Sequence, residues 1–278
     1  METKPILRRE RHVPRTGQPT LFQRAWLPAE PARALLIVHG VREHSGCYEP
    51  LARWFARRCC AVFAFDQRGH GRSGGARVHA RHFSDYLEDL AEVMGPVREE
   101  CPDRPLYLLG HDLGALVSAL FVQERAPDVA GALLSATPLT KPVGAATLRA
   151  TCANLLAAVA PRWRLRAGRR GEDPTAAPDC FEDPLVERGG ITASLRAQFL
   201  RATARLRAGA LNRPVLLLQG ERDPRCDPSA GQRFAQQAPQ GQLRTYPGLT
   251  QGILQAPSRE RVFSDMLAWL HEREENPA

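Results

Sequence analysis

The chain has 278 residues, of which 43% are hydrophobic, and this is enough to bury a sizeable core within one α/β domain. Its formal net charge is +8 at pH 7, but only Lys4 and Lys141 are lysines. Arginine-rich and lysine-poor usage is typical of some genome compositions, so the charge alone does not predict a nucleic-acid partner. No apolar run approaches the roughly 20 residues of a membrane-spanning helix.

Cysteine usage and the first 15 residues predict a cytoplasmic location. The seven cysteines form no C-x-x-C pair, and an odd number of this kind predicts reduced thiols. Residues 1–15 mix charge with proline and lack the apolar segment of a signal peptide. We predict neither a metal nor a cofactor, and the oligomeric state is left open.

Short apolar runs alternate with helix-like segments along the chain. Near-continuous apolar strands between helices predict an α/β fold with a mostly parallel sheet covered by helices on both faces. The predicted strands are a hairpin within 5–30 that includes Leu21–Trp26, then 34–38, 59–65, 105–109, 130–136, 214–218 and 243–246. The predicted helices are 48–57, 83–97, 113–122 and 262–270.

One turn, Gly110-His111-Asp112-Leu113-Gly114, has the spacing of a nucleophile elbow but carries an aspartate at its centre. The glycines on either side allow a sharp turn from strand to helix, because a Cβ at either position would clash. This turn raises its central side chain onto the end of the sheet. A serine there would be a nucleophile, whereas this chain presents a carboxylate.

The stretch between the strands near 136 and 214 interrupts the alternation. It contains several prolines, short helical patterns and an arginine cluster, and it is too long for a plain connection. We predict that residues 138–205 form a helical cap, and that 1–137 with 206–278 form the core. The arginine cluster predicts a solvated edge or a weak contact with an anionic membrane surface, and comprises Arg162, Arg164, Arg166, Arg169 and Arg170.

Four further stretches each carry a short motif of their own. They are Leu36–Tyr48 with H-G-x-x-E-H-x-x-x-Y, Phe65–Ser73 with D-x-R-G-H-G-x-S, Asp183–Val186 with Gly190 and Thr192 behind it, and Pro214–Asp223 with P-V-L-L-L-x-G-x-x-D. In this order, over essentially the whole chain, they resemble the monoacylglycerol lipase-like α/β-hydrolases, including the lysophospholipase-like and S33-type members. The resemblance implies an eight-stranded sheet, a cap inserted after the sixth strand, and an ancestor that hydrolysed lipid-like esters.

The resemblance also implies a serine, an acid and a histidine, in that chain order. The acid falls on Asp223, after a strand and Gly220. The serine falls on Asp112, and the histidine of a Y-P-G-x-x-H pattern falls on Gln251. The triad is therefore degenerate. His39, His44, His70 and His111 lie where the family has additional histidines, and we interpret them as structural.

The resemblance places the oxyanion hole at the backbone N–H groups of Val41 and Leu113. Backbone donors do not depend on side-chain identity, so the hole is expected to survive in form. We expect an ionised Asp112 that accepts hydrogen bonds from these groups, since it sits at a helix N-terminus. Such a carboxylate would repel a developing oxyanion.

Three function classes remain open. The favoured one is a retired hydrolase that binds a lipid-like or acyl ligand, or a partner, under its cap. The second is a lyase, cyclase or isomerase with Asp112 as base or electrostatic anchor. The third is hydrolysis by an unorthodox route. Attack of Asp112 on saturated carbon, as in epoxide hydrolases and haloalkane dehalogenases, is disfavoured because Gln251 cannot activate the water that completes turnover. Gly69–Gly74 formally reads G-x-G-x-x-G, but no helix opens behind it, so nucleotide binding is not predicted.

Overall fold

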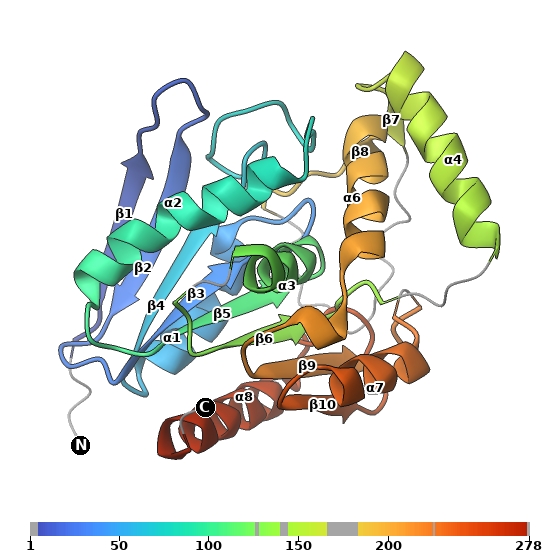
Figure 1. Cartoon of the computed structure of the whole chain (residues 1–278). Coiled ribbons are helices and arrows are strands. Elements are labelled where there is room, and N and C mark those ends of the chain that lie inside the picture. Colours follow the sequence, from blue (N-terminus) through green and yellow to red (C-terminus); the bar gives the residue numbers. More distant parts are fainter. Residues whose placement is uncertain (1–4, 126–127, 140–143, 166–182, 225, 277–278) are drawn as a thin grey trace.

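A computed structural model describes residues 5–125, 128–139, 144–165, 183–224 and 226–276 of the chain (Figure 1). Eight strands form the main sheet, in the order β1-β2-β4-β3-β5-β6-β9-β10. They are β1 (Leu7–Val13), β2 (Leu21–Leu27), β3 (Arg33–Val38), β4 (Cys60–Asp66), β5 (Leu106–His111), β6 (Gly131–Ser135), β9 (Val215–Gly220) and β10 (Gly241–Tyr246). Only β2 pairs antiparallel, with β1 and with β4, so the predicted mostly parallel sheet is confirmed.

Helices cover both faces because the strands bury side chains on both sides. Along β3, Leu35 and Ile37 join one apolar cluster, whereas Leu36 and Val38 join the other. On one face lie α2 (Ser84–Glu100), α3 (Leu113–Arg125) and α7 (Pro228–Gln237); on the other lie α1 (Glu49–Ala56) and α8 (Arg259–Glu275). Helix α7 was not predicted from the sequence; its ten residues are largely polar, and Phe234 packs inward.

Between β6 and β9 the chain forms α4 (Gly144–Val159), β7 (Arg164–Leu165), β8 (Ile191–Thr192), α6 (Ala193–Arg205) and the 3-10 turn η3 (Ala208–Ala210). Helix α4 packs along α6, away from β1 and β2 (Figure 1). Arg201 Nε donates to Asn154 Oδ1 at 2.9 Å between these two helices. The division into core and cap stays a prediction. Arg166, Arg169 and Arg170 of the arginine cluster lie outside the described residues.

The expectation of reduced cysteines is wrong at one position. Cys47, buried in the 3-10 helix η1 (Ser45–Tyr48), is disulfide-bonded. A count of cysteines could not reveal this, because pairing depends on which segments fold against each other. The cysteine count therefore no longer supports the expectation of a reducing compartment. Within the described ranges, no helix combines the length and the apolar character needed to cross a membrane.

Candidate functional site

The loops that carry the predicted site residues all follow carboxyl ends of neighbouring parallel strands. Val41 follows β3, Asp112 follows β5, Asp223 follows β9 and Gln251 follows β10. Parallel strands end at the same edge of a sheet, where open α/β folds bind ligands. The last two loops are joined directly, since Arg222 N–H donates to the Leu249 carbonyl at 2.9 Å.

The elbow has the geometry that its glycines predict. Asp112 lies between β5 and α3 with a φ of +51°, a backbone conformation that residues other than glycine rarely adopt. A Cβ on Gly110 would lie 2.4 Å from the Gly114 carbonyl oxygen. One on Gly114 would lie 1.9 Å from the Val38 carbonyl oxygen. The predicted sharp turn is confirmed, and it places α3 directly against the end of β3.

The Asp112 carboxylate reaches across to the loop after β3. Its Oδ2 accepts a hydrogen bond from the Val41 N–H at 3.3 Å, and the residue is only 3% exposed. The Asp112 N–H donates to the Ser135 carbonyl at 3.0 Å, which fixes the elbow against β6. The expected internal hydrogen bond of Asp112 is therefore present. It uses one of the two N–H groups that are predicted to form the oxyanion hole.

The second of these groups belongs to Leu113, a fully buried residue at the start of α3. The first N–H groups of a helix have no acceptor within the helix, so this donor is not used by the hydrogen bonds of α3 itself. Its contribution to an oxyanion hole stays a prediction.

A buried carboxylate that the sequence analysis missed holds the loop of Val41 in place. Glu43 Oε2 accepts from the Gly40 N–H at 2.9 Å and from the Tyr48 hydroxyl at 2.7 Å. Its other oxygen lies 3.9 Å from His111 Nε2, and His111 Nδ1 lies 3.1 Å from Ser135 Oγ. The glutamate and the histidine both stand in quoted motifs, which was the available signal. They connect the loop after β3 to the residue before the elbow and to β6.

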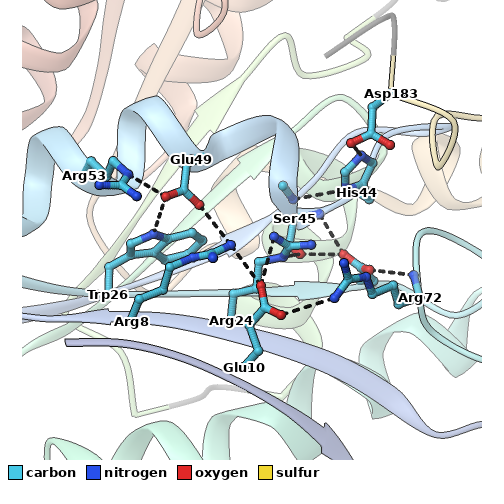
Figure 2. Close-up of polar contacts among 12 residues, drawn as sticks. Arg8, Glu10, Arg24, Trp26, His44, Ser45, Glu49, Arg53, Arg72 and Asp183 are labelled. Atoms are coloured by element: carbon cyan, nitrogen blue, oxygen red, sulfur yellow. Dashed lines mark hydrogen bonds and ion pairs between the residues drawn. The ribbon is translucent and has the colours of Figure 1, made fainter. Parts of the chain in front are cut away.

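A second network supports the same loop from the outer strands (Figure 2). Ser45 donates its N–H and its hydroxyl to Asp66 Oδ1, at 2.7 and 2.6 Å. Arg24 Nε donates to Ser45 Oγ at 3.0 Å, and its guanidinium lies 3.3 Å from Glu10 on β1. Arg72 donates its N–H to Asp66 Oδ2 at 2.7 Å. This chain of polar contacts ties the loop after β3 to β1, β2 and the end of β4.

The loop also contacts the stretch 183–187, which lies within the predicted cap. His44 Nε2 lies 3.3 Å from Asp183 Oδ2 (Figure 2), and the Glu187 N–H donates to the Arg42 carbonyl at 3.0 Å. Arg42 itself is buried and has φ of +69°. A positive φ at two residues of one site, Arg42 and Asp112, marks backbone strain of the kind found at functional sites.

Three buried histidines near the site, His39, His44 and His70, have pKa values that burial lowers, which keeps them neutral. Burial lowers the pKa of His70 to about 3, with a smaller contribution from His39. Burial also lowers the pKa values of His39 and His44, although Asp66 opposes the shift in both. His39 Nε2 accepts from the Gln67 N–H at 2.9 Å, so its Nδ1 carries the proton and faces the Gly40 carbonyl. These contacts are those of structural histidines.

Asp223, the predicted acid, is 5% exposed, and its N–H donates to the Gly220 carbonyl at 3.2 Å. Gln251, at the predicted base position, is 9% exposed. His271, the one histidine after Asp223 in the sequence, is exposed on α8. In the part of the chain that the structure describes, no three His, Cys, Asp or Glu side chains gather in a way that could hold a metal ion.

Comparisons with known proteins place these observations in a family. The model of the family described as "Serine aminopeptidase, S33" matches residues 29–256. The chain is 32% identical to the human monoglyceride lipase, over 91% of this chain and 87% of that one. It is 29% identical to the monoacylglycerol lipase of Mycolicibacterium smegmatis, over 88% and 90% of the two chains. A soluble variant of the Saccharomyces cerevisiae monoglyceride lipase, solved with a substrate analog, superposes with a TM-score of 0.83 at 20% identity, over 98% and 97% of the chains.

Proposed function

Because this chain belongs to the S33 serine aminopeptidase family and is a monoacylglycerol lipase-like α/β-hydrolase, we propose that it binds a lipid-like ligand without ordinary ester hydrolysis. The ligand would be a single-chain acyl compound held between the strand ends and a cap formed by residues 138–205. The catalytic triad would be degenerate, with Asp112 at the nucleophile position, Asp223 at the acid position and Gln251 at the base position.

The contact between Asp112 and Val41 carries this proposal. Acyl transfer needs an attacking hydroxyl and N–H donors aimed at the developing oxyanion. Asp112 supplies no hydroxyl, and its Oδ2 accepts from the Val41 N–H at 3.3 Å. The carboxylate thus takes a donor that the oxyanion would use, and its charge repels an oxyanion formed beside it. The same occupancy argues against a lyase or isomerase that would stabilise an enolate in this hole.

Gln251 also cannot act as the general base that activates a water molecule for hydrolysis. The amide of glutamine cannot accept a proton at neutral pH. An ester formed on Asp112 would therefore wait for a water molecule that no side chain at this position activates. Ordinary serine hydrolysis and turnover through an aspartyl ester are both disfavoured on this account.

The relatives support the class of ligand. Two relatives that match over most of the chain are named monoacylglycerol lipase and monoglyceride lipase, and a similar yeast monoglyceride lipase was solved with a substrate analog. Binding a ligand needs the cap and the end of the sheet, but not the triad. A chain that has lost the serine and the histidine can retain this part of the family's function.

We also propose that the cap contacts a membrane surface. Leu155 and Val159, one turn apart on α4, are 66% and 74% exposed, and Trp163 just beyond the helix is 64% exposed. Arg162 and Arg164 flank the tryptophan and are exposed. Exposed apolar side chains flanked by cations are typical of surfaces that bind anionic lipid.

Two measurements on the purified protein test the proposal. Hydrolysis of p-nitrophenyl butyrate is compared with buffer and with Asp112→Ala, and binding of 1-monodecanoylglycerol is measured by titration calorimetry. We expect no rate above buffer and saturable binding. A rate that vanishes in Asp112→Ala would show a working catalytic site and overturn the loss of hydrolysis. Absence of binding would overturn the proposed ligand class.

A further inference from the structure

Side-chain hydrogen bonds join the stretch 78–81, in the loop after β4, to the start of α6. Thr192 donates its N–H and its hydroxyl to the Val78 carbonyl, at 3.2 and 3.0 Å. Ser194 Oγ donates to the Ala80 carbonyl at 2.5 Å. We call these contacts, between residues 78–81 and 192–194, the α6 joint. They attach the proposed cap to the core at a place far along the chain from either end of the cap.

The α6 joint also holds the segment beyond α4 that carries the exposed tryptophan. The Ala193 N–H donates to the Trp163 carbonyl at 2.8 Å, and the Ser194 N–H donates to the Pro161 carbonyl at 3.0 Å. Residues 192–194 are therefore bonded to the core on one side and to 161–163 on the other. Opening of the joint would release this segment, with its exposed Trp163, from the core.

The closed joint holds one residue in a strained backbone conformation. Val78 is fully buried with φ of +46°, a region that β-branched residues rarely enter. Such a conformation persists only where the surrounding contacts enforce it. Here the Val78 N–H donates to the Gly69 carbonyl at 3.1 Å, and the Val78 carbonyl accepts both donors of Thr192. Loss of the Thr192 contacts would let Val78 relax, and this relaxation favours opening.

A histidine lies inside the joint. His79 Nδ1 is 3.2 Å from Thr192 Oγ1, whose own proton is donated to the Val78 carbonyl. Nδ1 therefore carries the proton of the neutral imidazole, and Nε2 is the atom that acid protonates. Among the described residues, the charged groups that act on the ring are Arg162, beyond α4, and Arg81, on the same stretch. From α6 the ring meets the neutral Thr192 hydroxyl.

Resting on the proposed cap, we infer that His79 makes the α6 joint sensitive to acid: the neutral imidazole keeps the joint closed, and protonation at Nε2 opens it. Protonation adds a third positive charge beside Arg162 and Arg81, in a partly buried place. Opening lets water solvate the ring and lets the cations move apart.

The direction of the pH dependence follows from the closed state. Burial, Arg162 and Arg81 lower the pKa of His79 below its ordinary value near 6.5. The open joint therefore binds more protons than the closed joint at mildly acidic pH. The contribution of His79 to closure is fully present above about pH 6.5 and is lost as the pH falls below it.

Hydrogen–deuterium exchange of the full chain at pH 7.5 and 5.5, read by mass spectrometry and corrected for intrinsic rates, measures this opening. Peptides that contain residues 192–194 report the joint, because all three amides are hydrogen-bonded in it or to 161–163. Peptides from β5 report unfolding of the whole core. We expect protection at 192–194 to fall at least about threefold more than in β5 between the two pH values, since opening takes up a proton.

Two histidine variants assign the effect. In His79→Asn the difference between 192–194 and β5 should disappear, because the amide keeps a donor for Thr192 but takes up no proton. His82→Asn is the matched control, since His82 is exposed in the same loop, and it should behave as the wild type. If circular dichroism shows that His79→Asn is misfolded, Arg162→Gln provides the test. Removal of this cation should make the fall smaller.

Three outcomes would overturn the inference. Equal losses in 192–194 and in β5 would mean that acid unfolds the whole protein. A loss confined to 192–194 that persists in a folded His79→Asn would come from another group. A fall of wild-type size in Arg162→Gln would exclude repulsion between these cations. The measurement needs neither ligand nor vesicle, so absence of lipid binding in calorimetry would overturn the proposed function and leave this result unaffected.

Discussion

The Val41 backbone N–H donates a hydrogen bond to the Asp112 carboxylate, at 3.3 Å between N and Oδ2. The two residues follow neighbouring parallel strands, β3 and β5, and are 71 positions apart in the chain. Their contact places a carboxylate on the backbone N–H group that a serine hydrolase of this fold would use for the oxyanion. The candidate site therefore has the fold of a hydrolase, but its central side chain is a hydrogen-bond acceptor that engages one of the predicted N–H donors.

A serine at position 112 and a histidine at position 251 should supply the proposed missing nucleophile and general base together. We expect Asp112→Ser with Gln251→His to hydrolyse p-nitrophenyl butyrate at least about a hundredfold faster than either single variant, since general base catalysis alone contributes this much. Initial rates at pH 8 test this, with Asp112→Ala and Gln251→His as the matched control. If the restored pair stays inactive while folded, the cap or the ligand site has diverged as well as the triad.

The close approach of α3 to β3 should make one elbow glycine irreplaceable. A Cβ on Gly114 would lie 1.9 Å from the Val38 carbonyl oxygen, so Gly114→Ala should lower the free energy of unfolding by about 3 kcal/mol or more. Gly209→Ala in η3 is the control, because its Cβ would lie 3.7 Å from the Gln237 carbonyl oxygen, an ordinary contact distance. This change should alter the free energy of unfolding by less than about 1 kcal/mol. Urea unfolding measures both, and equal effects would contradict the elbow geometry.

Acid should destabilise the protein through its buried histidines. The folded-state pKa of His70 is lowered to about 3, below the unfolded value near 6.5, so the unfolded chain binds more protons between these values. The contribution of His70 to the free energy of unfolding is fully present above about pH 6.5. Below this pH it falls by about 1.4 kcal/mol per pH unit.

Urea unfolding of the wild type and of His70→Asn between pH 7.5 and 5 tests this dependence. We expect the variant to lose less stability over this range, because the group that must be kept neutral is gone. His12→Asn is the control, since His12 is exposed on β1, and it should keep the slope of the wild type. An unchanged slope in His70→Asn would place the acid sensitivity elsewhere.

The exposed apolar side chains near the end of α4 should matter only at a lipid surface. We expect Val159→Ser with Trp163→Ser to weaken sedimentation with phosphatidylglycerol vesicles at least about tenfold, since each buried apolar side chain contributes about 1.5–3 kcal/mol. Leu7→Ser is the control, because Leu7 is 55% exposed on β1, far from α4 (Figure 1). Equal losses for both variants would mean that the cap is not the contacting surface.

Local pattern in the sequence was enough to identify most of the fold. Apolar runs separated by helical spacings gave the parallel strands, and the glycines around Asp112 predicted the elbow, because a tight turn depends on residues next to one another in the chain. The same local motifs indicated the family, and they predicted a substituted serine at position 112 and a substituted histidine at position 251. Helix α7 was not predicted, because its ten residues carry only one large apolar side chain, Phe234, toward the core.

Contacts between segments far apart in the chain were decided by the tertiary structure alone. The disulfide at Cys47, the Glu43 contact with His111 and the exposure of Trp163 depend on which surfaces meet after folding. The sequence by itself determined that position 112 carries a carboxylate on an elbow. The tertiary structure decided that this carboxylate lies against the Val41 N–H, since two parallel strands bring the loops together at one edge of the sheet.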